Sequence, residues 1–305
     1  FVLLSIPMFI LMGMGVAYSP AGKDLYTSLD RWLWRLPGGL VISNIGACSI
    51  FAALSGSSPA TCAAIGTMGI PEMRKRGYSD RIATGTIAAG GTLGVLIPPS
   101  IVLIVYGLAT GTSIGRLFLC GVIPGILLSF LFMIWAIIYS YFIDKESAKN
   151  LKSRQPPTLQ EKLEVIPRVA PFLAIVFGVL YVLYGGVATP SEASGVGAFL
   201  VFVMIAIVYK IYQPKKIWEI VKVSMKESVM IMFIIAASYI FSFTLSTLYV
   251  TQSLAETIIT LSTNKWIILF FVNIFLLIAG FFLPPVAVIV PVAVKLSPIV
   301  TSDVV

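Results

Sequence analysis

Long apolar runs constrain this chain more than any other feature of its 305 residues. Stretches of about 18 residues or more recur along it, which is the length that a helix needs to cross the hydrocarbon core of a bilayer. Only 11% of the residues are charged, whereas soluble domains carry roughly a quarter. A transmembrane β-barrel would show short alternating segments in place of continuous runs. The sequence therefore predicts an all-α membrane protein.

The net charge of +8 is concentrated in loops between the apolar runs. An excess of Lys and Arg marks the cytoplasmic loops of membrane proteins, so this distribution predicts topology and argues against a nucleic-acid partner. Residues 184–197 carry no basic side chain and are predicted to lie outside. The basic residues form three groups, which are Arg74, Lys75, Arg76 and Arg81; Lys145, Lys149, Lys152, Arg154, Lys162 and Arg168; and Lys210, Lys215, Lys216, Lys222 and Lys226.

Apolar runs and their flanking charges divide the chain into predicted segments. Because the chain opens and closes within apolar sequence, we expect a piece of a longer membrane protein, truncated at both ends. The predicted segments are a transmembrane helix at 1–18, an interfacial amphipathic helix at 21–36, a first hairpin at 40–70, a broken transmembrane helix at 83–106, transmembrane helices at 117–142, 169–184, 193–212 and 228–250, a basic surface helix at 213–227, an interfacial helix at 251–264 and a second hairpin at 266–294.

The two hairpins are predicted from the loop charges. Basic residues flank residues 40–70 on both sides, so this segment must enter and leave the membrane from the cytoplasm, as a re-entrant hairpin does. Counting crossings from there, residues 266–294 must enter from the periplasm. The order of span, amphipathic helix and hairpin thus occurs twice in opposite orientation. Inverted repeats with two re-entrant helical hairpins and broken helices are typical of secondary transporters.

Three breaks interrupt the apolar segments, at residues 55–61 (SGSSPAT), 94–99 (GVLIPP) and 280–285 (GFFLPP). Proline lacks the N–H that would bond a carbonyl one turn earlier, so the two Pro-Pro pairs release carbonyl oxygens at membrane depth. Carbonyls and hydroxyls together suit a hard cation such as Na⁺, and the dipole of a helix starting near Pro59 favours an anion. A Pro-Pro pair is equally compatible with a packing kink.

Several other residues receive structural interpretations. The chain has no His, which excludes His-ligated metals, and its Cys residues lack a metal-type spacing. No Asp or Glu lies deep in an apolar segment, so the carboxylate relay of proton-coupled carriers is missing and Na⁺ is favoured. Thr189 and Glu192 form a predicted capping box. Asn44 and Asn273 are expected to make interhelical hydrogen bonds.

The motifs around the first two breaks resemble the large membrane (M) subunit of TRAP (tripartite ATP-independent periplasmic) transporters, the DctM-like family. The resemblance covers essentially the whole chain. It is carried by residues 51–61 (FAALSGSSPAT), 70–78 (IPEMRKRGY) and 91–100 (GTLGVLIPPS), and also by 37–39 (PGG), 121–125 (GVIPG) and 186–193 (GVATPSEA).

This resemblance implies an elevator mechanism in the bacterial inner membrane, with Na⁺-coupled uptake of a small organic acid and no other cofactor. It also implies a small membrane subunit and a periplasmic binding protein as partners. By similarity, the predicted ion-binding residues are Ser55, Gly56, Ser58, Gly94, Ile97, Pro98, Gly280 and Leu283, and the predicted substrate-binding residues are Ser57, Ser58, Thr61 and Pro284.

Three rival functions stay open from the residues alone. A stand-alone symporter of organic anions and Na⁺ would share the fold without needing a binding protein. An ion channel would also use re-entrant loops, although channel filters usually sit on a symmetry axis and these two hairpins are unlike. A membrane-embedded hydrolase lacks any base to activate a Ser. We therefore predict that the chain is not an enzyme.

Overall fold

The computed structural model describes residues 2–33, 39–142, 157–249, 253 and 265–289, and all regular secondary structure in these residues is helical. A short 3-10 turn, η1 (Val2–Leu4), precedes the first α-helix. The α-helices are α1 (Ser5–Ala17), α2 (Ala21–Trp32), α3 (Gly39–Ser55), α4 (Ser58–Lys75), α5 (Asp80–Leu96), α6 (Ile101–Thr110), α7 (Ile114–Phe142), α9 (Leu159–Tyr184), α10 (Pro190–Ile207), α11 (Pro214–Thr247) and α13 (Lys265–Phe282). The predicted all-α class is confirmed for this part of the chain.

Helix lengths and compositions fit a chain that crosses a membrane several times. By length and composition, four described stretches could span a bilayer: Asp80–Thr110, Ile114–Tyr139, Pro190–Ile207 and Pro214–Thr244. Two bent pairs raise the number to six if each is one span. One of them joins α1 to α2 at an angle of 64°, where the chain passes from apolar sequence into the amphipathic helix.

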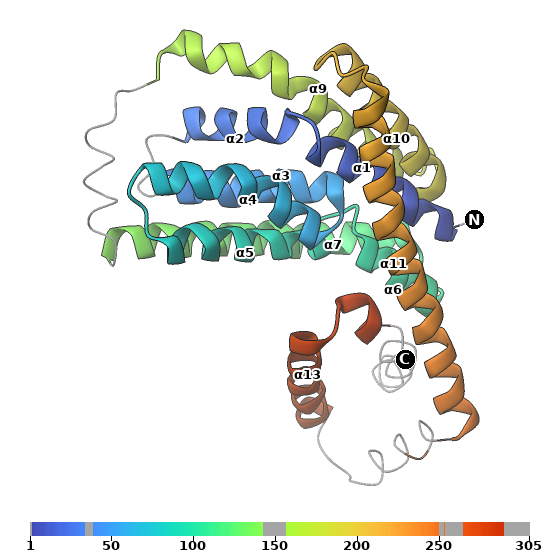
Figure 1. Cartoon of the computed structure of the whole chain (residues 1–305). Coiled ribbons are helices and arrows are strands. Elements are labelled where there is room, and N and C mark those ends of the chain that lie inside the picture. The colour runs from blue at the N-terminus through green and yellow to red at the C-terminus, as the bar shows by residue number, and fades with distance from the viewer. Residues whose placement is uncertain (1, 34–38, 143–156, 250–252, 254–264, 290–305) are drawn as a thin grey trace. The chain divides into compact units, whose positions relative to one another are not determined.

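The chain forms two compact units (Figure 1), residues 1–103 with 114–226 and residues 104–113 with 227–305. In the first unit α3 is the central helix, and it contacts α1, α2, α4, α5 and α7. Small residues allow this close packing, because Ala47, Cys48 and Ala52 on α3 are fully buried. Figure 1 shows α2, the α3–α4 pair and α5 lying side by side.

Helices α3 and α4 are joined by polar as well as apolar contacts. The Asn44 amide, 0% exposed, donates from Nδ2 to the Met73 sulfur at 2.8 Å. This bond crosses from α3 to α4 and confirms the interhelical role predicted for Asn44. A Cβ atom at Gly69 would lie 2.5 Å from Asn44 Oδ1, so the absence of a side chain at Gly69 lets α4 approach the amide.

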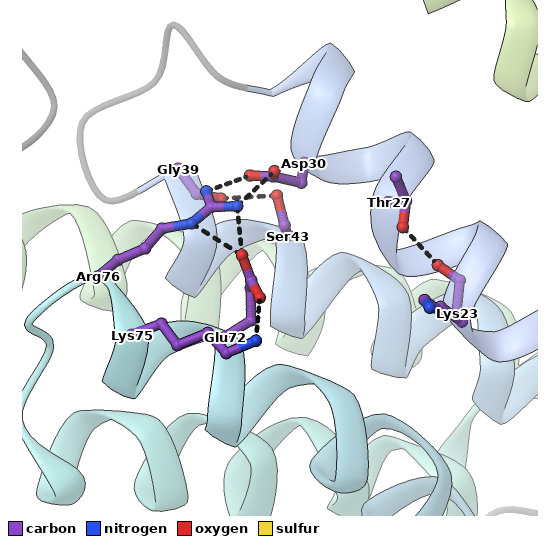
Figure 2. A network of polar contacts seen from close by, with 8 residues as sticks. All are labelled: Lys23, Thr27, Asp30, Gly39, Ser43, Glu72, Lys75 and Arg76. Atoms are coloured by element: carbon purple, nitrogen blue, oxygen red, sulfur yellow. Dashed lines mark hydrogen bonds and ion pairs between the residues drawn. The ribbon is translucent and has the colours of Figure 1, made fainter. Parts of the chain in front are cut away.

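An ion-pair network ties α2 to the end of α4 (Figure 2). The Arg76 guanidinium donates to both carboxylate oxygens of Asp30 at 3.3 Å and to Glu72 at 2.7 Å. The Asp30 side chain is only 7% exposed. Burying a charge is unfavourable unless it is paired. The Arg76 guanidinium pairs here with the carboxylates of both Asp30 and Glu72. The amphipathic helix α2 is thereby held against the helix that follows the first break.

Several helix boundaries differ from the sequence predictions. The predicted surface helix at 213–227 and span at 228–250 are one continuous helix, α11. The charged residues before Val169 are helical too, because α9 begins at Leu159 with a capping box between Thr158 and Glu161. Helix α10 has the predicted box, in which Glu192 N–H donates to Thr189 Oγ1 at 3.4 Å and Thr189 N–H to Glu192 at 2.8 Å. Apart from residue 253, the predicted helix at 251–264 lies outside the described residues.

Candidate functional site: two paired helix breaks

The first break separates α3 from α4 by only two residues. Ser55 ends α3, and Gly56 follows with φ of +57°, a left-handed conformation that glycine adopts without steric penalty. Ser57 is extended, and α4 begins at Ser58 with Pro59 in its first turn. Proline is favoured there because the first N–H groups of a helix need no intrahelical partner. This local chemistry explains why the chain turns sharply without losing either helix.

Hydroxyl groups at this break are bonded in different ways. The Ser55 and Thr61 hydroxyls lie 2.8 Å apart, and the Ser57 carbonyl accepts from Thr61 Oγ1 at 2.9 Å. Ser55 and Thr61 are both buried. Ser58 Oγ, in contrast, is buried and has no hydrogen-bond partner among the residues that the structure describes. A buried polar atom without a partner is unfavourable and needs an explanation, such as an ion or water.

The second break lies between α5 and α6 and contains Pro98 and Pro99. Neither proline has an N–H, so the helical bonds to the carbonyls of Gly94 and Val95 cannot form. The Ser100 hydroxyl donates to the Val95 carbonyl instead. The Gly94 carbonyl receives no such replacement from Ser100. Both carbonyls thus lack the helical N–H partner, and a hydroxyl replaces it at Val95.

The two breaks pack backbone against backbone within the first unit. Ile101 N–H donates to the Gly56 carbonyl at 3.2 Å. A Cβ atom at Gly56 would lie 2.5 Å from the Pro99 carbonyl oxygen, and one at Gly94 would lie 2.7 Å from the Ser57 carbonyl carbon. Such distances are not tolerated between real atoms, so both glycines are needed for the approach. The main chains of the two breaks are therefore in direct contact.

Glycines on two further helices close around the paired breaks. A Cβ at Gly13 of α1 would lie 2.5 Å from the Cα atom of the last residue of α3. On α7, a Cβ at Gly121 would lie 2.8 Å from the Leu96 carbonyl oxygen, and one at Gly125 would lie 2.9 Å from Ile97 Cγ1. Sequence reasoning did not assign Gly121 and Gly125 to the site. Their spacing of one helical turn, typical of close helix packing in membranes, was the available signal.

The predicted third break occurs in the second unit. Helix α13 ends at Phe282, Leu283 N–H donates to the Ala279 carbonyl at 2.9 Å, and a further helical turn follows Pro284. Gly280, Leu283 and Pro284 are exposed in the described structure. A Cβ atom at Gly280 would meet no described atom within 4 Å. Among the described residues, the sequence signal of a glycine four residues before Pro-Pro thus occurs here without the close packing seen at Gly94.

The structure gathers the members of the predicted site that belong to the first unit. No group of three or more His, Cys, Asp or Glu side chains that could hold a metal occurs among the described residues. The polar groups of the two breaks are hydroxyl and carbonyl oxygens, which are hard ligands. The gathered residues are Ser55, Gly56, Ser57, Ser58, Thr61, Gly94, Ile97 and Pro98.

Comparisons with known proteins identify the family. Residues 1–302 match the model of the "Tripartite ATP-independent periplasmic transporter, DctM component". The C4-dicarboxylate TRAP transporter large permease DctM of Pseudomonas aeruginosa is 37% identical over 98% of this chain and 69% of its own length. That of Vibrio cholerae is 36% identical over 98% and 69%. The isethionate TRAP permease DctMQ of Oleidesulfovibrio alaskensis is 34% identical over 98% of this chain and 46% of its own length. These relatives are permeases and not enzymes, and the chain belongs to the DctM family of TRAP transporter large permease subunits.

Proposed function

We propose that this multi-pass membrane subunit couples the uptake of a small organic acid to the entry of Na⁺ across the bacterial inner membrane. The observation that carries the proposal is the Ser58 hydroxyl, which is buried without a hydrogen-bond partner among the described residues. It lies at a place where two broken helices meet through their backbones. A hydroxyl without a partner, in a region where two prolines remove the helical N–H partners of carbonyl groups, is an environment that suits a dehydrated cation.

The chemistry of the donors supports Na⁺ as the co-transported ion. Ser58 Oγ and the Gly94 carbonyl would be its first ligands, with Ser55, Gly56, Ile97 and Pro98 completing the shell. None of these donors is a carboxylate. Proton-coupled carriers generally rely on an acidic side chain that gains and loses the proton, so an all-oxygen neutral site favours a metal cation. Gly280 and Leu283 belong, in this proposal, to a second ion site in the second unit.

The start of α4 supports binding of an anion next to the ion. The free N–H groups in the first turn of this 18-residue helix and its dipole attract negative charge. Ser57 is half-buried and its side chain makes no capping bond, so its hydroxyl is available to a carboxylate. The Thr61 hydroxyl is bonded to Ser55 and Ser57 and would position Ser57 more than it contacts substrate. Pro284, in the second unit, is included as a substrate-binding residue by the family resemblance alone.

Two named relatives support an organic acid as the substrate, since one is named for C4-dicarboxylates and the other for isethionate. The family description as tripartite supports two partners: a small membrane subunit and a periplasmic binding protein that delivers the substrate. In the proposed elevator cycle, the two hairpins are re-entrant, opening from the cytoplasm and from the periplasm. They move together with the bound ion and anion past the remaining helices.

Transport by the reconstituted system tests the proposal. The full-length subunit, its small membrane partner and the binding protein encoded beside it would be assayed in proteoliposomes with radiolabelled succinate and isethionate. We expect uptake only with an inward Na⁺ gradient and only with the binding protein present. Uptake driven by a proton gradient in Na⁺-free buffer would contradict Na⁺ coupling. Uptake without the binding protein would instead identify a stand-alone symporter.

A further inference from the structure

A groove on the first unit, away from the paired breaks, has no assigned role. It has a volume of about 350 Å³ and lies between α3, α5 and α7. Most of its lining is apolar and comes from all three helices, including Val41, Ile45, Ile82, Ala89, Phe132 and Ala136. An apolar slot of this kind on a membrane protein offers room for a hydrocarbon chain.

One end of the groove carries an arginine among aromatic rings. Arg81, in the first turn of α5, lines the groove together with Trp135 and Tyr139 near the end of α7. Arg81 is exposed, and no carboxylate among the described residues pairs with it, whereas the neighbouring Arg74 pairs with Asp80 at 2.6 Å. Tryptophan and tyrosine are enriched at the level of lipid headgroups. This end therefore combines a positive charge with the side chains of a membrane interface.

Gly85 leaves space in the groove that no described side chain fills. It lies one turn beyond Arg81 on the same face of α5 and lines the groove. A Cβ atom at Gly85 would meet no described atom within 4 Å. On the same helix, a Cβ at Gly90 would lie 2.8 Å from Cys48 Cβ, and Gly94 is held against the first break. Gly85 has no such contact in the described structure, so the floor of the groove stays open at this position.

We propose that this groove binds one anionic phospholipid of the cytoplasmic leaflet. The phosphate would accept hydrogen bonds from the Arg81 guanidinium, which matches phosphate in charge and geometry. One acyl chain would lie past Gly85 and Ala89 toward Phe132, and the Trp135 and Tyr139 rings would lie beside the headgroup. The cytoplasmic side follows from the basic loop at 74–81. The site is independent of Na⁺ and substrate binding.

Lipid binding to the purified full-length protein tests this site. Delipidated protein in detergent would be titrated with dioleoyl phosphatidylglycerol, with dioleoyl phosphatidylcholine and with sn-glycerol 3-phosphate, and bound molecules counted by native mass spectrometry. We expect one tight phosphatidylglycerol per chain, weaker phosphatidylcholine and no binding of the free headgroup. Arg81→Gln should weaken phosphatidylglycerol roughly fivefold, the effect of one basic side chain near an anionic leaflet. It should weaken phosphatidylcholine less, because the choline cation offsets the charge of the phosphate.

Gly85→Leu tests the acyl-chain position separately. It fills open space and strengthens the helix, so it should fold normally and weaken both lipids. Matched controls are Arg116→Gln, at the opposite end of α7, and Gly178→Leu, on α9, where a Cβ also meets no described atom within 4 Å. Equal lipid binding by all four variants would overturn the proposal, as would tight binding of glycerol phosphate alone. Each variant would also be co-purified with the small membrane subunit. Loss of that subunit, and not of lipid, in the two groove variants would overturn the proposal, because the occupant would then be a protein helix.

Discussion

The break at Gly94 and the break at Gly280 have the same sequence signal and different surroundings. Each has glycine four residues before Pro-Pro. Gly94 is buried against the Ser57 carbonyl of another helix, whereas Gly280 is exposed and a side chain there would meet no described atom within 4 Å. The motif therefore specifies that a helix is interrupted, and a facing break determines whether the released carbonyls become part of a packed site.

The largest effect should follow substitution of Gly56. Gly56→Ala adds a Cβ at a positive φ of +57° and 2.5 Å from the Pro99 carbonyl. We expect a loss of about 2–4 kcal/mol, combining backbone strain with overpacking, read as a lower midpoint of thermal unfolding in detergent. Gly186→Ala is the matched control, because φ there is +66° and no described atom lies within 4 Å of a Cβ. Equal losses for the two variants would show that the facing break does not constrain Gly56.

The second-largest effect should follow substitution of Gly94, which tests the difference between the two Pro-Pro breaks directly. Gly94→Ala introduces a Cβ 2.7 Å from the Ser57 carbonyl carbon without backbone strain. We expect destabilisation of about 1–3 kcal/mol, together with a loss of Na⁺-driven uptake. Gly280→Ala should leave the unfolding midpoint unchanged or slightly higher, since alanine favours a helix. A similar loss of stability in both variants would mean that the two breaks are packed alike.

The smallest change in stability is expected for substitution of Gly125, on helix α7, which packs against the second break. Gly125→Ala places a Cβ 2.9 Å from Ile97 Cγ1, a side-chain atom that moves when Ile97 changes its rotamer. We expect a change of less than about 1 kcal/mol. Gly121→Ala, directed at the Leu96 carbonyl oxygen at 2.8 Å, should destabilise more because backbone cannot move as easily. If thermal unfolding showed that Gly125→Ala destabilises more than Gly121→Ala, the backbone of the second break would not be rigid.

Local features of the fold could be predicted from the sequence, because they depend on neighbouring residues. The turn at Gly56, the helix start before Pro59 and the capping box at Thr189 are each decided by a few side chains. The sequence did not predict that α11 is one continuous helix, because a change of composition suggests a helix boundary. The change from basic to apolar composition near Ser228 marks where a helix would enter lipid, and nothing there interrupts backbone hydrogen bonding.

Contacts between distant segments could not be predicted in the same way. The hydrogen bond from Ile101 to Gly56 and the approach of Gly13 to the end of α3 depend on how four helices pack. The candidate residues Ser55 and Ser58 were named from a family resemblance and a Ser-rich break. Their difference, one hydroxyl bonded and the other without a partner in the described structure, arises only from the folded arrangement.

Direct measurement of Na⁺ binding tests the central claim. Purified full-length wild type, Ser58→Ala and the matched control Ser43→Ala would be compared by scintillation proximity with radioactive sodium. Ser43 lies on α3, is 0% exposed and is bonded to the Gly39 carbonyl at 2.7 Å. We predict that Ser58→Ala weakens Na⁺ binding about tenfold or more, as expected for a lost bond to a charged group, and that Ser43→Ala binds like wild type. Unchanged Na⁺ affinity in Ser58→Ala would contradict a Na⁺ site at the paired breaks.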